Sequence, residues 1–263
     1  MWEARDDARD GALVAVKLLH RPTSVAATRF LRGADLASRL DHPNIVPVHA
    51  YGETDGGDAW VAMARVAGAP LDAATRHRPI PWARALGLMD QLLAALAATH
   101  AAGVVHRDVK PGNCFVVEGS PRARLLLGDY GLATVAERGA LEVIPAPGSG
   151  GAPIRGVCGT PEYLAPEQIL GARLDGRADV YAAAITLYRL IAGTPPFAGP
   201  DRGALYLAHL GEARPRVEAP AGLPRVPARL ADIVARGMAR DPRDRWESAE
   251  TMRLALGTVP TPA

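Results

Sequence analysis

The residues whose types and spacing could do chemistry lie close together in the run HRDVKPGN at residues 106–113. This run carries the carboxylate of Asp108, the ammonium of Lys110 and the carboxamide of Asn113. Such a set suits phosphoryl transfer, because the transition state of that reaction is stabilised by the position and charge of surrounding groups, with little covalent chemistry. The alternative interpretation is an ordinary polar turn after a helix.

A second acidic residue follows at a fixed distance. The Ala/Leu-rich stretch 82–102 predicts a helix before the run, and the apolar residues 114–117 and 125–127 predict two strands after it. Asp129, Tyr130 and Gly131 come directly after the second strand. A simple D-x-G turn is the more common interpretation of that triplet alone, but its distance from the run favours a shared site.

The distribution of lysine supports the same region. Of the 30 basic residues only Lys17 and Lys110 are lysines, so 28 are arginines. Lysine provides a compact ammonium, whereas arginine provides a planar fork. We infer that both positions require the ammonium.

These runs resemble the signature of eukaryotic-type (Hanks-type) protein serine/threonine kinases, and the bacterial members most closely. Residues 106–113 are similar to the catalytic loop H-R-D-x-x-x-x-N, residues 129–131 to D-F-G with Tyr for Phe, and the end of GTPEYLAPE (159–167) to A-P-E. The resemblance covers the chain from Met1 to about Leu256. It implies an α+β, two-lobed protein kinase fold, with a small β-rich N-lobe that is N-terminally truncated and a larger α-helical C-lobe.

The resemblance implies roles for the chemical groups, with ATP and Mg²⁺ as cofactors. Asp108 would accept the proton of the substrate hydroxyl, and Lys110 would neutralise charge on the transferring phosphoryl group. Asn113 and Asp129 would hold the magnesium ion, which prefers hard oxygen ligands. Lys17, at the end of the strand VAVK, would contact the α and β phosphates.

It also implies residues around the adenine. Ala15 and Phe115 would lie on the two faces of the base, and Met63 would lie where the hinge between the lobes begins. Core packing explains these three residues equally well.

Another group would support the catalytic loop. Thr160 would bond near Asp108 and Lys110, and this pattern is the serine/threonine version of the signature. Glu167 would pair with a late arginine, Arg245. Asp179 would anchor the loop backbone, although an acid favoured by the helix dipole is the alternative.

Regulation is implied at the activation segment. Arg107 would grip a phosphorylated residue there, and Ser149, in a Gly/Pro-rich stretch (138–156) expected to be a long loop, is the better candidate for autophosphorylation because Thr160 is expected to be structural. A homodimer for autophosphorylation is a further hypothesis.

The expected organisation is a kinase domain over residues 1–257 and a short tail over 258–263. Residues 1–66 would form the partial N-lobe, with strands over 13–17, 46–51 and 59–66 and a helix over 24–40. Residues 67–257 would form the C-lobe, with helices over 82–102, 178–192 and 230–239 and an activation segment over 129–167.

Two departures from the pattern favour an alternative, a pseudokinase that acts as a nucleotide-binding scaffold or regulator. The glycine-rich loop over the phosphates is absent, and Met1–Ala4 align with the segment that follows it, so we expect either a misplaced start or a missing lid. The helix glutamate that should pair with Lys17 is Gly33, which costs about 1 kcal/mol relative to Ala. Asp35 would replace it only if the helix turned or frayed, and an unpaired Lys17 would be poorly positioned, with low activity as the consequence.

Composition excludes several other classes. A net charge of +2 gives no sign of a nucleic-acid-binding arm, and two distant cysteines predict neither disulfides nor a zinc site. No segment is apolar and long enough to span a membrane, so we expect a cytoplasmic location. The resemblance implies protein substrates. A small-molecule kinase is disfavoured because GTPEYLAPE resembles a segment that holds protein substrates.

Overall fold

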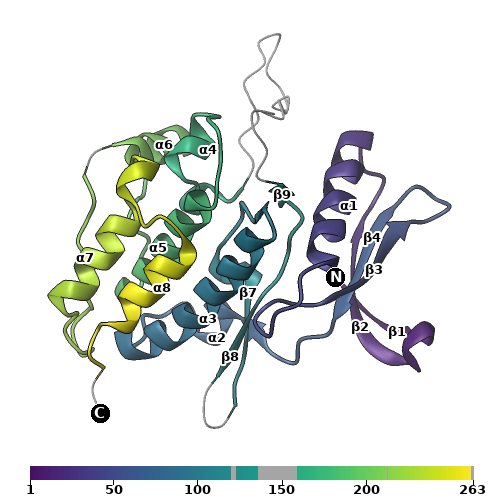
Figure 1. The fold of residues 1–263 in the computed structure, drawn as a ribbon, viewed down its shortest axis with the longest axis horizontal. Coiled ribbons are helices and arrows are strands. Elements are labelled where there is room, and N and C mark those ends of the chain that lie inside the picture. Colours follow the sequence, from purple (N-terminus) through teal and green to yellow (C-terminus); the bar gives the residue numbers. More distant parts are fainter. Residues whose placement is uncertain (120–122, 136–158, 212, 262–263) are drawn as a thin grey trace.

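The computed structural model describes residues 1–119, 123–135, 159–211 and 213–261. Its two parts differ in secondary structure (Figure 1). The N-terminal part is an antiparallel sheet of β1 (Trp2–Asp6), β2 (Ala12–Leu19), β3 (Val48–Glu53) and β4 (Ala59–Ala64) in the order β1-β2-β4-β3. The valines of β2 and β4 suit a pleated, half-buried surface. The helix α1 (Ser24–Ser38) packs against this sheet through Phe30 and Ala34.

The larger part is helical. It contains α2 (Leu71–Ala74), α3 (Trp82–Ala101), α4 (Pro166–Ile169), α5 (Arg177–Ala192), α6 (Arg202–Leu210), α7 (Ala228–Gly237) and α8 (Ala249–Gly257). Every residue from Ala178 to Leu187 in α5 is buried, because α3, α7 and α8 pack around this helix. A helix that is apolar on all sides belongs in a core, and α5 therefore forms the fixed centre of this part.

Short strands before and after α3 bring distant residues of the sequence together. One small sheet pairs β5 (Ala69–Pro70) with β7 (Cys114–Val117) and β7 with β8 (Arg124–Leu127), and a second pairs β6 (Val104–Val105) with β9 (Thr134–Val135). Because β7 and β8 are antiparallel, with Cys114 opposite Leu127, the start of β7 and the end of β8 meet at one edge. That edge carries Asn113 just before β7 and Asp129 just after β8.

The expected α+β organisation in two parts is confirmed, and the differences lie at the ends of predicted elements and in short elements that were not predicted. The helix predicted over 24–40 ends at Ser38, and the strand predicted over 46–51 runs from Val48 to Glu53. The helices α6 and α8 were not predicted, although Asp201 and Ser248 cap their first turns by accepting backbone N–H bonds. Among the described residues no helix is long and apolar enough to cross a membrane. The predicted loop over 138–156 lies outside the described residues.

Candidate active site

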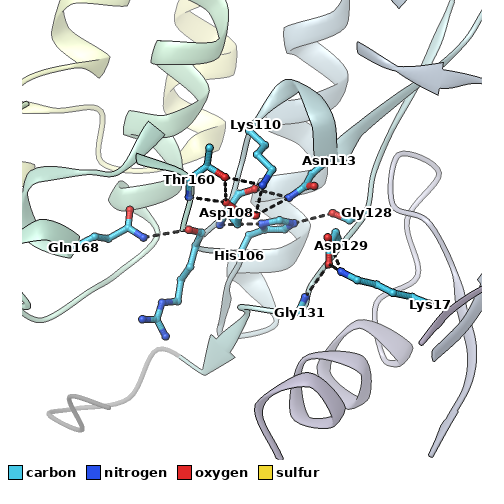
Figure 2. Close-up of polar contacts among 11 residues, drawn as sticks. Lys17, His106, Asp108, Lys110, Asn113, Gly128, Asp129, Gly131, Thr160 and Gln168 are labelled. Carbon is cyan, nitrogen blue, oxygen red and sulfur yellow. Dashed lines mark hydrogen bonds and ion pairs between the residues drawn. The ribbon is translucent and has the colours of Figure 1, made fainter. Parts of the chain in front are cut away.

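Asp108 lies at the centre of a connected group of polar side chains (Figure 2). Its Oδ2 accepts hydrogen bonds from Lys110 Nζ at 2.8 Å and from Asn113 Nδ2 at 3.0 Å. Its Oδ1 accepts the Thr160 backbone N–H at 3.1 Å and the Thr160 hydroxyl at 2.9 Å. Lys110 Nζ also donates to Thr160 Oγ1 at 2.6 Å. The structure thus brings Asp108, Lys110, Asn113 and Thr160 together, including the contacts of Thr160 that the resemblance implied.

The backbone of this loop is fixed by Asp179 from the first turn of α5. The carboxylate of Asp179 accepts the N–H groups of His106 and Arg107, each at 2.8 Å. His100 Nε2 lies 2.8 Å from the same carboxylate. Burial alone would raise the pKa of Asp179, but the hydrogen bond from His100, with a further contribution from the His106 N–H, outweighs it, so the pKa lies below its ordinary value. The anchoring contact expected of Asp179 is present.

Arg107 has a backbone conformation that needs this support. Its φ is 69°, in the left-handed region that is unfavourable for a residue with a side chain. The bond from its N–H to Asp179 and the bond from Gln168 Nε2 to its carbonyl, at 3.1 Å, hold it there. Strained residues of this kind persist only where their surroundings fix them.

The expected partner of Glu167 is also present. Arg245 donates to the two carboxylate oxygens of Glu167 at 2.6 and 2.7 Å, and the side chains are 0% and 7% exposed. The Arg245 guanidinium lies 4.8 Å from the ring centroid of Tyr181. This pair joins the end of the activation segment to the C-terminal residues of the domain core.

On the other side of the site, Lys17 pairs with Asp129. Lys17 Nζ lies 2.6 and 2.8 Å from the two carboxylate oxygens (Figure 2). Burial would raise the pKa of Asp129, but the charge and hydrogen bond of Lys17 outweigh it and lower the pKa. Lys17 is therefore paired although the helix glutamate is missing, and its partner is Asp129.

Asp35 does not replace that glutamate. The helix α1 is regular around it, and its carboxylate accepts bonds from the Tyr51 hydroxyl at 2.7 Å and from Arg39 Nη2 at 2.7 and 2.9 Å. These bonds lower the pKa of Asp35, the one from Tyr51 most of all.

Gly33 is required by close packing, so the expectation that it destabilises the helix relative to alanine is wrong. A Cβ at this position would lie 2.1 Å from the carbonyl oxygen of Tyr130 and 3.3 Å from the Cα of Gly131. Alanine is therefore worse than glycine here, although it is the better helix former. Because Gly33 has no side chain, α1 contacts the backbone of the D-Y-G triplet (residues 129–131) directly.

The sequence of the chain also matches a known protein family. Residues 4–255 match the protein kinase domain family. The chain belongs to this family. It is 34% identical to serine/threonine-protein kinase pkn3 of Myxococcus xanthus over 98% of this chain and 47% of that protein. It is 37% identical to PknD of Mycobacterium tuberculosis over 97% of this chain and 37% of that protein. It therefore spans less than half the length of these relatives.

The kinase domain places two side-chain oxygen ligands where they could hold a magnesium ion. Asn113 donates through Nδ2 to Asp108, and no described residue donates to its Oδ1. Asn113 and Asp129 are brought to one edge by the β7–β8 pairing, where Gly128 N–H bonds to the Asn113 carbonyl at 2.9 Å. An amide oxygen and a carboxylate are ligands that magnesium prefers.

Of the three residues predicted around the adenine, only Met63 lines the pocket found between the two parts. Met63 lines a pocket between α1, the sheet and the D-Y-G triplet, together with Lys17, Phe30 and Tyr130. Ala15 is opposite Met63 in the β2–β4 register. Phe115 packs beneath Gly128, where an added Cβ would lie 3.1 Å from its ring. Ala15 and Phe115 do not line that pocket, and the role of all three residues stays a prediction.

The sequence analysis missed three contacts that support the D-Y-G triplet and the catalytic loop on their buried side. The buried Tyr130 hydroxyl lies 2.9 Å from Thr99 Oγ1 of α3, and the Tyr130 ring lies 4.6 Å from the His106 ring. His100, which contacts Asp179, was also missed. A tyrosine in place of the usual phenylalanine was the available signal, because a buried hydroxyl needs a partner. Ser149 lies outside the described residues.

Proposed function

We propose that this chain transfers the γ-phosphoryl group of ATP to serine or threonine hydroxyls of protein substrates. The supporting observation is the position of Asp108, whose carboxylate is held by Lys110, Asn113 and Thr160 within 3.1 Å. The names of the relatives, all serine/threonine-protein kinases, agree with this activity.

Asp108 would accept the proton of the attacking hydroxyl, and its bonds hold it in one orientation. The Thr160 hydroxyl already bonds to both Asp108 Oδ1 and Lys110 Nζ, which illustrates that a hydroxyl fits between these groups. Lys110 would offset the negative charge that moves with the phosphoryl group. The backbone bonds to Asp179 keep this geometry fixed before substrate arrives.

Asn113 and Asp129 would hold the magnesium ion, which when bound neutralises charge on the nucleotide phosphates. Lys17 would bind the phosphates, and to do so it would exchange its bond to Asp129 for the incoming anion. The two side chains of this pair are each 34% exposed, so water can assist the exchange.

A pseudokinase that binds nucleotide without transfer is the second candidate. Gly33 and the direct Lys17–Asp129 pair favour it, because both the ammonium and the metal-binding carboxylate already have a partner. The bonded geometry of Asp108 favours transfer, because a scaffold has no need for it.

The test is phosphate incorporation from Mg-ATP into the chain and into a generic protein substrate, measured by intact mass. We expect incorporation that falls by about 10²–10⁴-fold in Asp108→Asn, the range for loss of a positioned base. Asp55→Asn, an exposed acid of the N-terminal part, is the matched control and keeps the wild-type rate. No incorporation in the wild type would favour the pseudokinase. Ser149→Ala in the same assay tests whether that residue is the autophosphorylation site.

A further inference from the structure

A surface pocket lies beside the catalytic loop on the helical part. It is lined by Asp72, His77, Arg78, Pro111, Arg189 and Gly193. These residues come from α2 and the turn after it, from the 3₁₀ turn Pro111–Asn113, and from the C-terminal end of α5. The proposed transfer reaction leaves this pocket unexplained.

The pocket is continuous with the groups that surround Asp108. Pro111 follows Lys110 directly, and a Cβ at Gly112 would lie 3.9 Å from Lys110 Cε and 4.0 Å from Asp72 Oδ2. Arg189 Nη1 donates to the Tyr163 hydroxyl at 2.7 Å, and the Tyr163 N–H bonds to the Thr160 carbonyl at 2.9 Å. A peptide whose hydroxyl reaches Asp108 therefore passes close to this pocket.

The pocket is mainly cationic. Arg78 and His77 are exposed, and neither side chain forms an ion pair with the described residues. Arg189 is half-buried, and it donates a hydrogen bond to the neutral hydroxyl of Tyr163. Asp72 is the one acidic residue of the lining. Two guanidinium groups thus face a space with a single carboxylate, and the imidazole of His77 stands beside them.

The turn that carries His77 and Arg78 is held in place. The His77 N–H bonds to the Asp72 carbonyl at 2.7 Å, and the Arg78 N–H bonds to the Thr75 carbonyl at 3.0 Å. Arg76 and His77 both have positive φ values, 53° and 54°, which these bonds stabilise. The side chains of His77 and Arg78 therefore project from a defined turn beside α2.

We propose that this pocket binds an anionic side chain of the protein substrate, located a few residues from the serine or threonine that is phosphorylated. The inference rests on the proposed function and adds to it a substrate class. Guanidinium groups bind carboxylates and phosphates through paired, charge-assisted hydrogen bonds. Glutamate, aspartate and an already phosphorylated residue share this chemistry.

The test measures binding, so that it does not depend on turnover. Labelled peptides with one serine in a neutral background carry glutamate, phosphoserine, alanine or arginine at each flanking position in turn, and their Kd values are measured by fluorescence anisotropy. We expect one position at which glutamate binds roughly tenfold more tightly than alanine, the size of one charge-assisted bond, and at which arginine binds more weakly. Comparing the glutamate and phosphoserine peptides at that position shows which anion the pocket prefers.

Two variants locate the effect. Arg78→Glu changes an exposed side chain, so the fold is retained, and it should reverse the order of the glutamate and arginine peptides. Arg225→Glu is the matched control, because Arg225 is an exposed arginine of the helical part that does not line the pocket, and it should keep the order. Equal Kd values for all peptides, or an order that Arg78→Glu leaves unchanged, would overturn the inference. Loss of phosphate incorporation with the order intact would instead contradict the proposed function alone.

Discussion

The two sides of the active site are held in different ways. Around Asp108, every carboxylate oxygen is bonded within the protein, and the supporting pair Glu167–Arg245 is 7% and 0% exposed. Around Lys17, a single ion pair with Asp129 connects the sheet to the D-Y-G triplet, and both side chains are 34% exposed. One side is fixed by several bonds to one carboxylate and by a buried ion pair, whereas the other depends on a single exchangeable contact.

This difference follows the chemistry expected of each side. A base must keep one orientation before the substrate arrives, because orientation supplies much of the catalytic effect. A phosphate-binding lysine must give up its partner when the nucleotide binds, and a partly exposed ion pair costs little to break. Gly33 sharpens the contrast, because the helix that usually supplies a carboxylate supplies instead a close backbone contact with Tyr130.

The largest expected effect tests the buried side. Glu167→Gln leaves the fully buried guanidinium of Arg245 without a charge partner. We expect the free energy of unfolding to fall by about 3–5 kcal/mol, as for other broken buried ion pairs, measured by urea denaturation. The control Asp232→Asn breaks the Arg216–Asp232 pair, which is 52% and 66% exposed, and should cost less than about 1 kcal/mol. Similar losses in the two variants would contradict the comparison.

The next prediction tests the contact between α1 and the D-Y-G triplet. Gly33→Ala places a methyl group against the Tyr130 carbonyl, so α1 must shift and the stability should fall by about 1–3 kcal/mol. Gly87→Ala is the matched control, because Gly87 is an exposed glycine of α3 with no atom within 4 Å of an added Cβ. It should gain about 1 kcal/mol from helix propensity alone. A gain in both variants would show that α1 is not in close contact with Tyr130.

How much of this could be read from the sequence also differs between the two sides. The catalytic loop was predictable because Asp108, Lys110 and Asn113 are close in the chain, where spacing carries the information. The partner of Lys17 was not predictable, because Lys17 and Asp129 are far apart in the sequence. Their contact depends on how the N-terminal sheet packs against the β7–β8 pair. The same holds for the Thr99–Tyr130 contact, which crosses from α3 to the triplet.

The element boundaries show a similar limit. Long apolar stretches such as α3 and α5 were predicted to within one residue of their observed ends, because periodicity over several turns is a strong signal. The short helices α2 and α4 were missed, since four residues carry no period. The helices α6 and α8 were missed although Asp201 and Ser248 marked where they begin.

A pH effect tests how far the buried network extends. His209 is fully buried, with Nδ1 bonded to the hydroxyl of Tyr181, whose ring lies against Arg245. Burial, with a smaller contribution from the charge of Arg214, lowers the pKa of His209 from 6.5 to about 4. The unfolded chain therefore binds this proton more readily than the folded protein, and the stability is fully present above pH 6.5 and lost as the pH falls toward 4.

The size of this effect can be measured against a variant. We expect wild-type stability to fall by about 2 kcal/mol between about pH 7 and 5, where few carboxylates titrate. His209→Gln should lose less over the same range, because its side chain does not titrate. The measurement is the urea midpoint at the two pH values. Parallel losses in the two proteins would place the pH dependence elsewhere.

The smallest expected effect on stability tests the exchangeable side. Lys17→Met keeps an apolar side chain in the pocket that Phe30 also lines and removes the charge facing Asp129. We expect the free energy of unfolding to fall by less than about 1 kcal/mol, because water reaches both groups of the pair. Since Lys17 lowers the pKa of Asp129, this loss should be present above the ordinary carboxyl pKa of 3.8 and fade as the pH falls below it. A loss as large as that of Glu167→Gln would mean that both sides of the site are equally fixed, and that nucleotide binding would have to break a strong contact to engage Lys17.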